Sequence, residues 1–108
     1  MQYMLLIYVP TDGSERAESS AWMEYTQRLQ DAGVMVAGDG LQGLDTASTV
    51  RVRDGETLVT DGPFAETKEQ LGGYYLLDCG SLDEAIEFAA RIPAAERGAV
   101  EVRPLVER

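Results

Sequence analysis

The run YMLLIYV, Tyr3 to Val9, decides the fold that this sequence can adopt. It is almost entirely apolar and rich in strand formers, so it predicts a central β-strand covered on at least one face. Pro10 follows and ends the strand. A second run of this kind, GYYLLDC from Gly73 to Cys79, predicts another strand. Because successive side chains of a strand point to opposite faces, both faces of the sheet are expected to be apolar.

Two amphipathic helices are predicted outside these strands. Apolar residues recur at helical spacing from Ala17 to Ala32, and Gly33 follows as a stop signal. Asp12 with Glu15 fits a modified capping box for this helix, with the Ser14 hydroxyl as an alternative cap. The second helix is predicted within SLDEAIEFAARI, residues 81–92, where Ser and Glu stand at capping-box spacing.

Two shorter strands and a hairpin complete the pattern. VMVAG at residues 34–38 predicts a short buried strand, and AVEVRPL at residues 99–105 predicts a half-buried one. Between them, residues 48–62 alternate around an Asp54-Gly55 pair, which is the usual signal of a tight β-hairpin. The sequence therefore predicts a two-stranded arm inserted into the middle of the chain.

Without the arm, the order strand, helix, strand, strand, helix, strand predicts an α+β, ferredoxin-like split β-α-β sandwich. Residues 1–108 are expected to form a single domain of this fold, with both helices on one face of the sheet. The helix-free face is apolar and needs a cover. A second copy of the chain is the simplest cover, so we expect a homodimer whose two sheets face each other as a dimeric α/β-barrel.

Composition excludes several classes of function. Nine basic and nineteen acidic residues give a net charge of -10, which disfavours nucleic acid as a direct partner. The chain has no histidine and one cysteine, Cys79, so no small zinc framework, metal site or intrachain disulfide is expected, and no cofactor motif is found. The apolar N-terminal run is too short for a membrane span and has no basic flank, so we expect a cytoplasmic protein.

Candidate functional residues gather in DGPFAETKEQLGGYY, residues 61–75. The charged residues are candidates for proton transfer next to a carbonyl, with carboxylates as bases and the lysine holding a carboxylate or enolate. Tyrosines can donate hydrogen bonds, and glycines permit close approach of a ligand. The catalytic candidates are Asp61, Glu66 and Lys68, and the ligand-binding candidates are Tyr8, Phe64, Gly72, Gly73 and Tyr74.

A purely structural interpretation of this stretch stands beside the functional one. Phe64 and Leu71 would cover the open edge of the sheet, and Thr67 to Gln70 would form one helical turn with its charges in solvent. Gly72-Gly73 would then mark a bend or β-bulge at the start of the strand.

Several stretches together resemble one family. YMLLIY, AGDGL, TVRVRDG, DGPFAETKEQLGGYYLLD and ARIPAAERGAVEVRPL are similar to the DGPF group of the YCII-related family. The resemblance implies a ferredoxin-like, dimeric α/β-barrel protein, usually cytoplasmic and bacterial. Some relatives look like enzymes that act on small unsaturated acids with a histidine and an aspartate, but that dyad does not transfer to a chain without histidine. Some DGPF genes lie beside extracytoplasmic-function sigma factors, which implies a role in transcription regulation.

Three hypotheses follow. The first is a dimeric domain that binds a small, acidic organic ligand, with a non-redox lyase or isomerase as its enzymatic form. The second is a regulatory module that docks another protein such as a sigma factor. The third is a structural dimer without a ligand.

Overall fold

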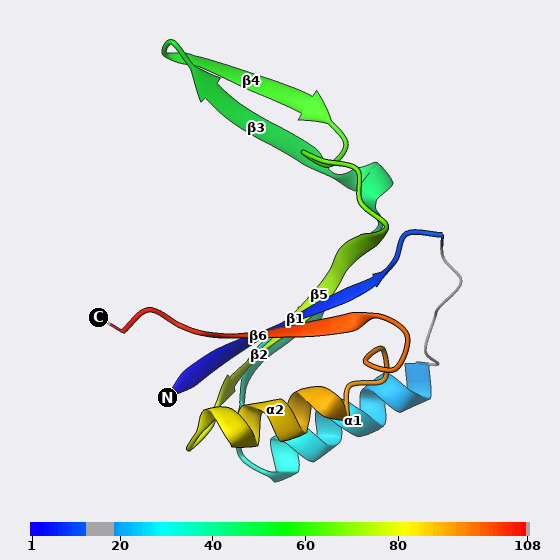
Figure 1. Ribbon diagram of the computed structural model, residues 1–108, viewed down its shortest axis with the longest axis vertical. Coiled ribbons are helices and arrows are strands. Elements are labelled where there is room, and N and C mark those ends of the chain that lie inside the picture. The colour runs from blue at the N-terminus through cyan, green and yellow to red at the C-terminus, as the bar shows by residue number, and fades with distance from the viewer. Residues whose placement is uncertain (13–18, 108) are drawn as a thin grey trace.

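The computed structural model describes residues 1–12 and 19–107. Strand β1 (Gln2–Pro10) lies inside a four-stranded sheet of order β2-β5-β1-β6 (Figure 1). It pairs antiparallel with β5 (Glu69–Asp78) on one side and with β6 (Ala99–Pro104) on the other. The central position predicted for the apolar run is therefore confirmed.

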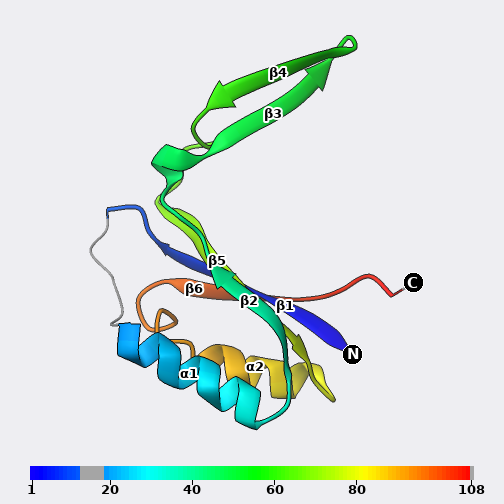
Figure 2. The ribbon, with the colours of Figure 1, turned by 180° about the vertical axis from the view of Figure 1, so that it is seen from behind.

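Two helices, α1 (Ser19–Asp31) and α2 (Leu82–Ala90), cover the same face of the sheet (Figure 2). The result is a mixed α+β structure, as predicted, and its element order is consistent with a ferredoxin-like fold. Helix α1 is followed by Gly33 at φ 71°, the left-handed conformation that glycine tolerates. The predicted cap of α1 depends on Ser14 and Glu15, and residues 13–18 lie outside the described residues.

The cap of α2 is confirmed. The Ser81 side chain accepts a hydrogen bond from the Glu84 backbone N–H at 3.2 Å. The Glu84 carboxylate reaches one residue further back than a standard capping box and accepts from the Gly80 N–H at 3.2 Å. Both bonds satisfy backbone donors at the start of α2, so this helix begins where the sequence places it.

The core lies between the helices and one face of the sheet. Alternate residues of β1 and β5 are buried there and meet Tyr25 and Leu29 of α1. The buried strand residues are Tyr3, Leu5, Ile7, Tyr75 and Leu77. The intervening residues point to the helix-free face and are only half-buried: Met4, Leu6, Tyr8, Tyr74 and Leu76. The sheet thus has two apolar faces, of which the helices cover one.

Tyr25 is a titratable residue buried in the core. Its hydroxyl donates to the Phe88 carbonyl at 2.8 Å, and its ring meets Tyr75 edge-on at 5.3 Å. Burial raises the pKa of Tyr25 above its usual value, and the nearby Tyr75 adds to the shift. The folded protein therefore keeps this proton at a pH where the unfolded chain loses it.

Stability is expected to fall in alkali because of Tyr25. The unfolded tyrosine ionises near pH 10, so the contribution of Tyr25 is complete below about pH 10 and is lost as the pH rises further. The slope attributable to one such group reaches about 1.4 kcal/mol per pH unit. Chemical unfolding of Tyr25→Phe and wild type between pH 9 and 11 measures this slope, which the variant should lack. Equal alkaline slopes would contradict the assignment.

Three local predictions were wrong at least in part. The strand predicted at residues 34–38 is present, and Val34 is buried, but β2 (Met35–Gly40) is an edge strand that pairs with β5 alone among the described strands, and Val36 is exposed there. The isolated run of apolar letters gave no information on its place in the sheet. The helical turn proposed for Thr67 to Gln70 is absent, because β5 already begins at Glu69, and Phe64 is exposed rather than covering the sheet edge.

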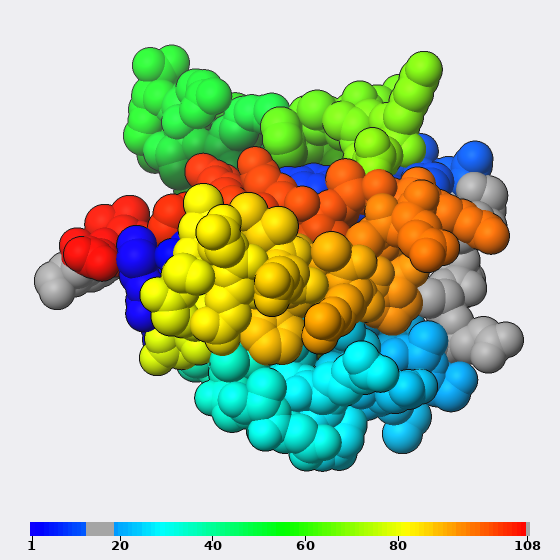
Figure 3. Space-filling view, turned by 60° about the horizontal axis from the view of Figure 1, so that its bottom comes forward, coloured from blue at the N-terminus to red at the C-terminus, as the bar shows by residue number. Residues whose placement is uncertain are grey.

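The predicted hairpin is confirmed and forms a separate two-stranded sheet of β3 (Ser48–Arg53) and β4 (Glu56–Asp61). Asp54 and Gly55 take φ values of 51° and 77°, as a tight hairpin turn requires. The short 3-10 helix η1 (Leu44–Thr46) leads into this arm. In Figure 3 the arm (green) lies across the sheet from the two helices. The radius of gyration is 15.7 Å, which is larger than the value of about 13 Å for a compact chain of this length.

Candidate functional site

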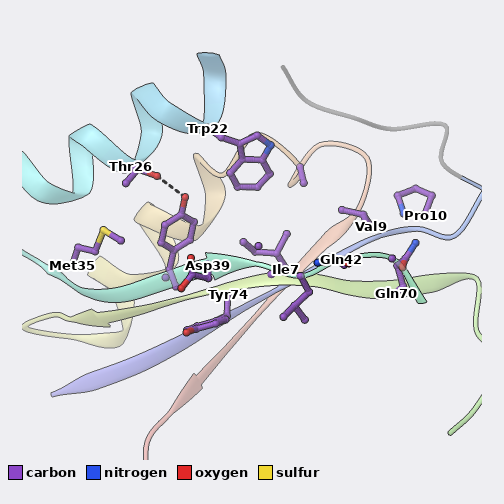
Figure 4. A pocket seen from close by; sticks show the side chains of 18 residues that line it. Ile7, Val9, Pro10, Trp22, Thr26, Met35, Asp39, Gln42, Gln70 and Tyr74 are labelled. Atoms are coloured by element: carbon purple, nitrogen blue, oxygen red, sulfur yellow. Dashed lines mark hydrogen bonds between the residues drawn. The ribbon is translucent and has the colours of Figure 1, made fainter. Parts of the chain in front are cut away.

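A pocket of about 710 Å³ opens between α1 and the end of the sheet that leads to the arm (Figure 4). Side chains and backbone of β1, α1, β2, β5 and two loops line it. The lining residues are Ile7, Val9, Pro10, Trp22, Thr26, Met35, residues 38–43, Gln70, residues 72–75 and Ala94.

Glycines give the pocket its floor. The pairing of β1 with β5 steps from Ile7 opposite Gly73 to Tyr8 opposite Leu71, so Gly72 is an extra residue in β5. The predicted bulge is therefore present. A Cβ on Gly73 would lie 2.9 Å from the Asp39 carbonyl oxygen, so only glycine lets β2 and β5 approach this closely here.

Trp22 and a pair of hydroxyl groups form the wall on the helix side. The Thr26 hydroxyl and the Tyr75 hydroxyl lie 2.7 Å apart and share a hydrogen bond between α1 and β5. Trp22 lies one turn before Thr26, and both line the same pocket (Figure 4). This wall combines an aromatic ring with a polar pair, a combination that small-molecule sites commonly use to fix a ligand.

The pocket is poor in charge. Asp39 contributes the carboxylate of the lining, and the amides of Gln42 and Gln70 add neutral polar groups. None of the described lining residues is a lysine or an arginine. Electrostatic attraction for an anionic ligand is therefore weak within the pocket itself.

The pocket brings together part of the predicted ligand-binding set. Gly72, Gly73 and Tyr74 line it, although the Tyr74 ring projects to the opposite side of the strands from Trp22 (Figure 4). Tyr8 lies half-buried on the helix-free face and is not a lining residue. Phe64 is exposed in the connection that follows the arm.

The three catalytic candidates are not brought into the pocket. Asp61 ends β4, Glu66 lies in the connection to β5, and all three side chains, including that of Lys68, are exposed. Lys68 is fixed through its backbone, since its carbonyl accepts from the Thr11 N–H at 2.9 Å and from the Thr11 hydroxyl at 3.0 Å. In the sequence, Lys68 lies two residues before Gln70, which does line the pocket.

The sequence interpretation missed Trp22, Thr26, Tyr75 and Asp39. Trp22 and Thr26 are four residues apart and therefore share a helix face, so their proximity could have been predicted from the sequence. Nothing in the sequence pairs Thr26 with Tyr75, because they are 49 residues apart.

Two features are absent from the described residues. Within residues 1–12 and 19–107, no three Cys, Asp or Glu side chains come together as a metal ion would require. Neither α1 nor α2, the helices of the described chain, is long and apolar enough to cross a bilayer.

These features define a class of small α+β proteins with a ferredoxin-like element order and a pocket beside a bulged strand. A family model for the YCII-related domain matches residues 1–108, so the chain belongs to this family. It is also 61% identical over 61 residues to "Uncharacterized protein R00369" of Rhizobium meliloti (strain 1021), a match that covers 55% of this chain. The chain spans about half the length of that curated relative, 49%.

Proposed function

We propose that this protein is a cytoplasmic, DGPF-group member of the YCII-related family that binds a small organic ligand in the pocket beside α1. One observation carries the proposal: Trp22 and the Thr26–Tyr75 hydroxyl pair line a space of about 710 Å³ over a glycine floor. Pockets that bind small molecules are usually concave, mostly apolar and about 300–1,000 Å³, with few polar groups.

The lining narrows the kind of ligand. An acidic ligand was expected from the sequence, with Lys68 as its anchor, but Lys68 does not line the pocket and Asp39 does. A carboxylate would meet a like charge without a basic partner. A neutral ligand with an unsaturated ring for Trp22 and a hydroxyl for the Thr26–Tyr75 pair fits the lining better.

The enzymatic form of the proposal is a non-redox lyase or isomerase. Among the described lining residues Asp39 carries the carboxylate, which makes it the candidate base of this form. The predicted catalytic residues do not line the pocket of their own chain. A second protomer would have to supply them for this form to use Asp61, Glu66 and Lys68.

The ligand proposal is tested with the fluorescence of Trp22, the one tryptophan in the sequence. Benzyl alcohol, benzoate and benzylamine share a ring and differ in charge. We expect benzyl alcohol to change the emission and raise the melting temperature, with benzoate at least about tenfold weaker, which corresponds to about 1.4 kcal/mol. Tyr75→Phe should weaken benzyl alcohol binding about fivefold by removing about 1 kcal/mol of hydrogen bonding.

Lys68→Met is the control for this titration, because Lys68 lies outside the pocket and the variant should bind like wild type. If none of the three compounds changes the emission, the pocket proposal is wrong. If benzoate binds best and Lys68→Met abolishes its binding, the acidic ligand expected from the sequence is restored.

The proposed assembly is a homodimer joined through the helix-free face. The half-buried Met4, Leu6 and Leu76 on that face support it, since an apolar sheet face of this kind is normally covered. The expected result in sedimentation at micromolar concentration is a dimer, and a monomer would contradict this part of the proposal.

A regulatory module linked to an extracytoplasmic-function sigma factor is the second candidate function. The apolar residues exposed on the arm favour it, because such residues mark protein contacts. Co-purification of a sigma factor that is lost in an arm variant but kept in Tyr75→Phe would favour this candidate over the ligand-binding one.

A further inference from the structure

A patch of the sheet without side chains faces α1 in the pocket. Gly40 of β2 pairs with Gly73 of β5, and Gly38, two residues earlier, pairs with Tyr75. Side chains of directly paired residues, and of residues two apart in one strand, point to the same face of a sheet. Because the Tyr75 hydroxyl reaches Thr26 of α1, these three glycine positions all face α1.

The three glycines of this patch have different surroundings. A Cβ on Gly38 would lie 2.5 Å from Cδ1 of Tyr75, so the Tyr75 ring rests directly on the backbone of Gly38. A Cβ on Gly73 would come within 2.9 Å of the backbone of β2, which excludes a side chain there. The nearest heavy atom to a Cβ on Gly40 is the Gly72 carbonyl oxygen at 3.9 Å, so this position opens into the pocket. The floor is therefore bare backbone at Gly40 and Gly73, bounded by the Tyr75 ring.

Trp22 forms the opposite boundary of this space. It lies on α1, and Figure 4 shows its ring across the pocket from β2 and β5. Trp22 is half-buried, so part of its ring remains accessible to a ligand. An aromatic ring on one side and backbone without side chains on the other form a slot with two flat walls.

The slot is larger than a single small ring requires. A cavity of about 150 Å³ is enough to hold benzene, and the pocket has about 710 Å³. Neighbouring strands lie about 4.8 Å apart, so the paired Gly40 and Gly73 leave a bare strip across both β2 and β5. A flat ligand with two fused rings contacts this strip along its length, whereas a puckered, saturated ring of the same size contacts two flat walls less completely.

We propose that the pocket is specific for flat ligands with at least two fused aromatic rings, held between Trp22 and the backbone of Gly40 and Gly73. A hydroxyl group on the ligand meets the Thr26–Tyr75 pair at the edge of the slot. Gly40 is then a specificity-determining residue, because a larger side chain there would occupy the place of the rings. The inference rests on the proposed ligand site and defines the class of ligand and the residues that select it.

The first test compares three neutral alcohols by isothermal titration calorimetry of the full chain. 2-Naphthylmethanol has two fused rings, benzyl alcohol has one, and decahydro-2-naphthylmethanol is the saturated, puckered counterpart of the first. We expect 2-naphthylmethanol to bind at least about fivefold more tightly than either of the others, which corresponds to about 1 kcal/mol.

The outcomes separate this inference from the ligand proposal on which it rests. If benzyl alcohol binds and 2-naphthylmethanol binds no more tightly, or if the saturated compound binds as well as 2-naphthylmethanol, the flat slot is overturned while the ligand proposal stands. If none of the three alcohols binds, both are overturned.

Gly40→Leu tests the floor of the slot directly. We expect it to weaken binding of 2-naphthylmethanol at least about tenfold, with Gly40→Ala between this variant and wild type. The control is Thr57→Leu, which adds the same side chain at an exposed position of β4 outside the pocket and should bind like wild type. Circular dichroism checks that each variant is folded.

Wild-type affinity in folded Gly40→Leu, or an equal loss in Thr57→Leu, would overturn the role of Gly40. The series of alcohols uses the wild-type chain and decides the inference even where Gly40→Leu does not fold.

Discussion

Replacing Gly98 with alanine is expected to destabilise the protein by about 3 kcal/mol, the upper end for overpacking at a well-packed position. A Cβ at this position would lie 2.0 Å from the Tyr8 carbonyl oxygen. That oxygen belongs to β1, which is held between β5 and β6 and cannot move away without disturbing both ladders. Urea unfolding of the variant and wild type measures the difference.

Gly40→Ala is the control for this substitution. The nearest heavy atom to a Cβ on Gly40 is the Gly72 carbonyl oxygen at 3.9 Å, an ordinary contact, and Gly40 has no positive φ. Its free energy of unfolding should stay within about 1 kcal/mol of the wild-type value. Equal losses in Gly98→Ala and Gly40→Ala would show that the close approach to Tyr8 is not what requires glycine.

Leu29→Ala is expected to cost about 2–5 kcal/mol, the range for deleting a buried leucine side chain. Leu29 is fully buried in the core, where α1 packs on the sheet. Because a domain of this size is usually stable by only about 5–15 kcal/mol, this one change removes a large part of the total. The melting temperature and the urea midpoint should both fall.

Met23→Ala tests whether burial rather than helix propensity causes that loss. Met23 lies in the same helix as Leu29 but is 72% exposed. Alanine and methionine are both good helix formers, so this variant should change stability by no more than about 0.5 kcal/mol. A loss comparable to that of Leu29→Ala would contradict the packing of α1 described above.

The proposed ligand site and the arm are joined by one part of the fold. The bulge at Gly72 opens the end of the sheet beside α1, and the chain that borders this opening continues into the arm.

Much of the fold is predictable because its signals are local. The apolar run of β1, the Asp54-Gly55 turn, the stop at Gly33 and the Ser81 cap each depend on a few neighbouring residues. Backbone sterics and short hydrogen bonds act over the same few residues, so the sequence alone specifies these elements. The apolar character of both sheet faces also follows from simple alternation.

The candidate site was predictable only in part, because side chains that meet in the pocket are far apart in the sequence. The Gly72-Gly73 pair was predicted to mark a bend or β-bulge and lines the pocket, whereas Asp61, Glu66 and Lys68 do not. Charged loop residues occur both on solvent-exposed surfaces and in functional sites, and only the path of the folded chain shows which of the two applies.

The sequence by itself determined the helices, the strands, the hairpin turn and the acidity of this protein. The tertiary structure alone decided that β2 is an edge strand, that Thr26 meets Tyr75, and that Asp39 rather than Lys68 lines the pocket. Local elements are fixed by neighbours a few residues away. A pocket forms where segments distant in the chain pack around a space, and a sheet face stays uncovered where no distant segment packs on it.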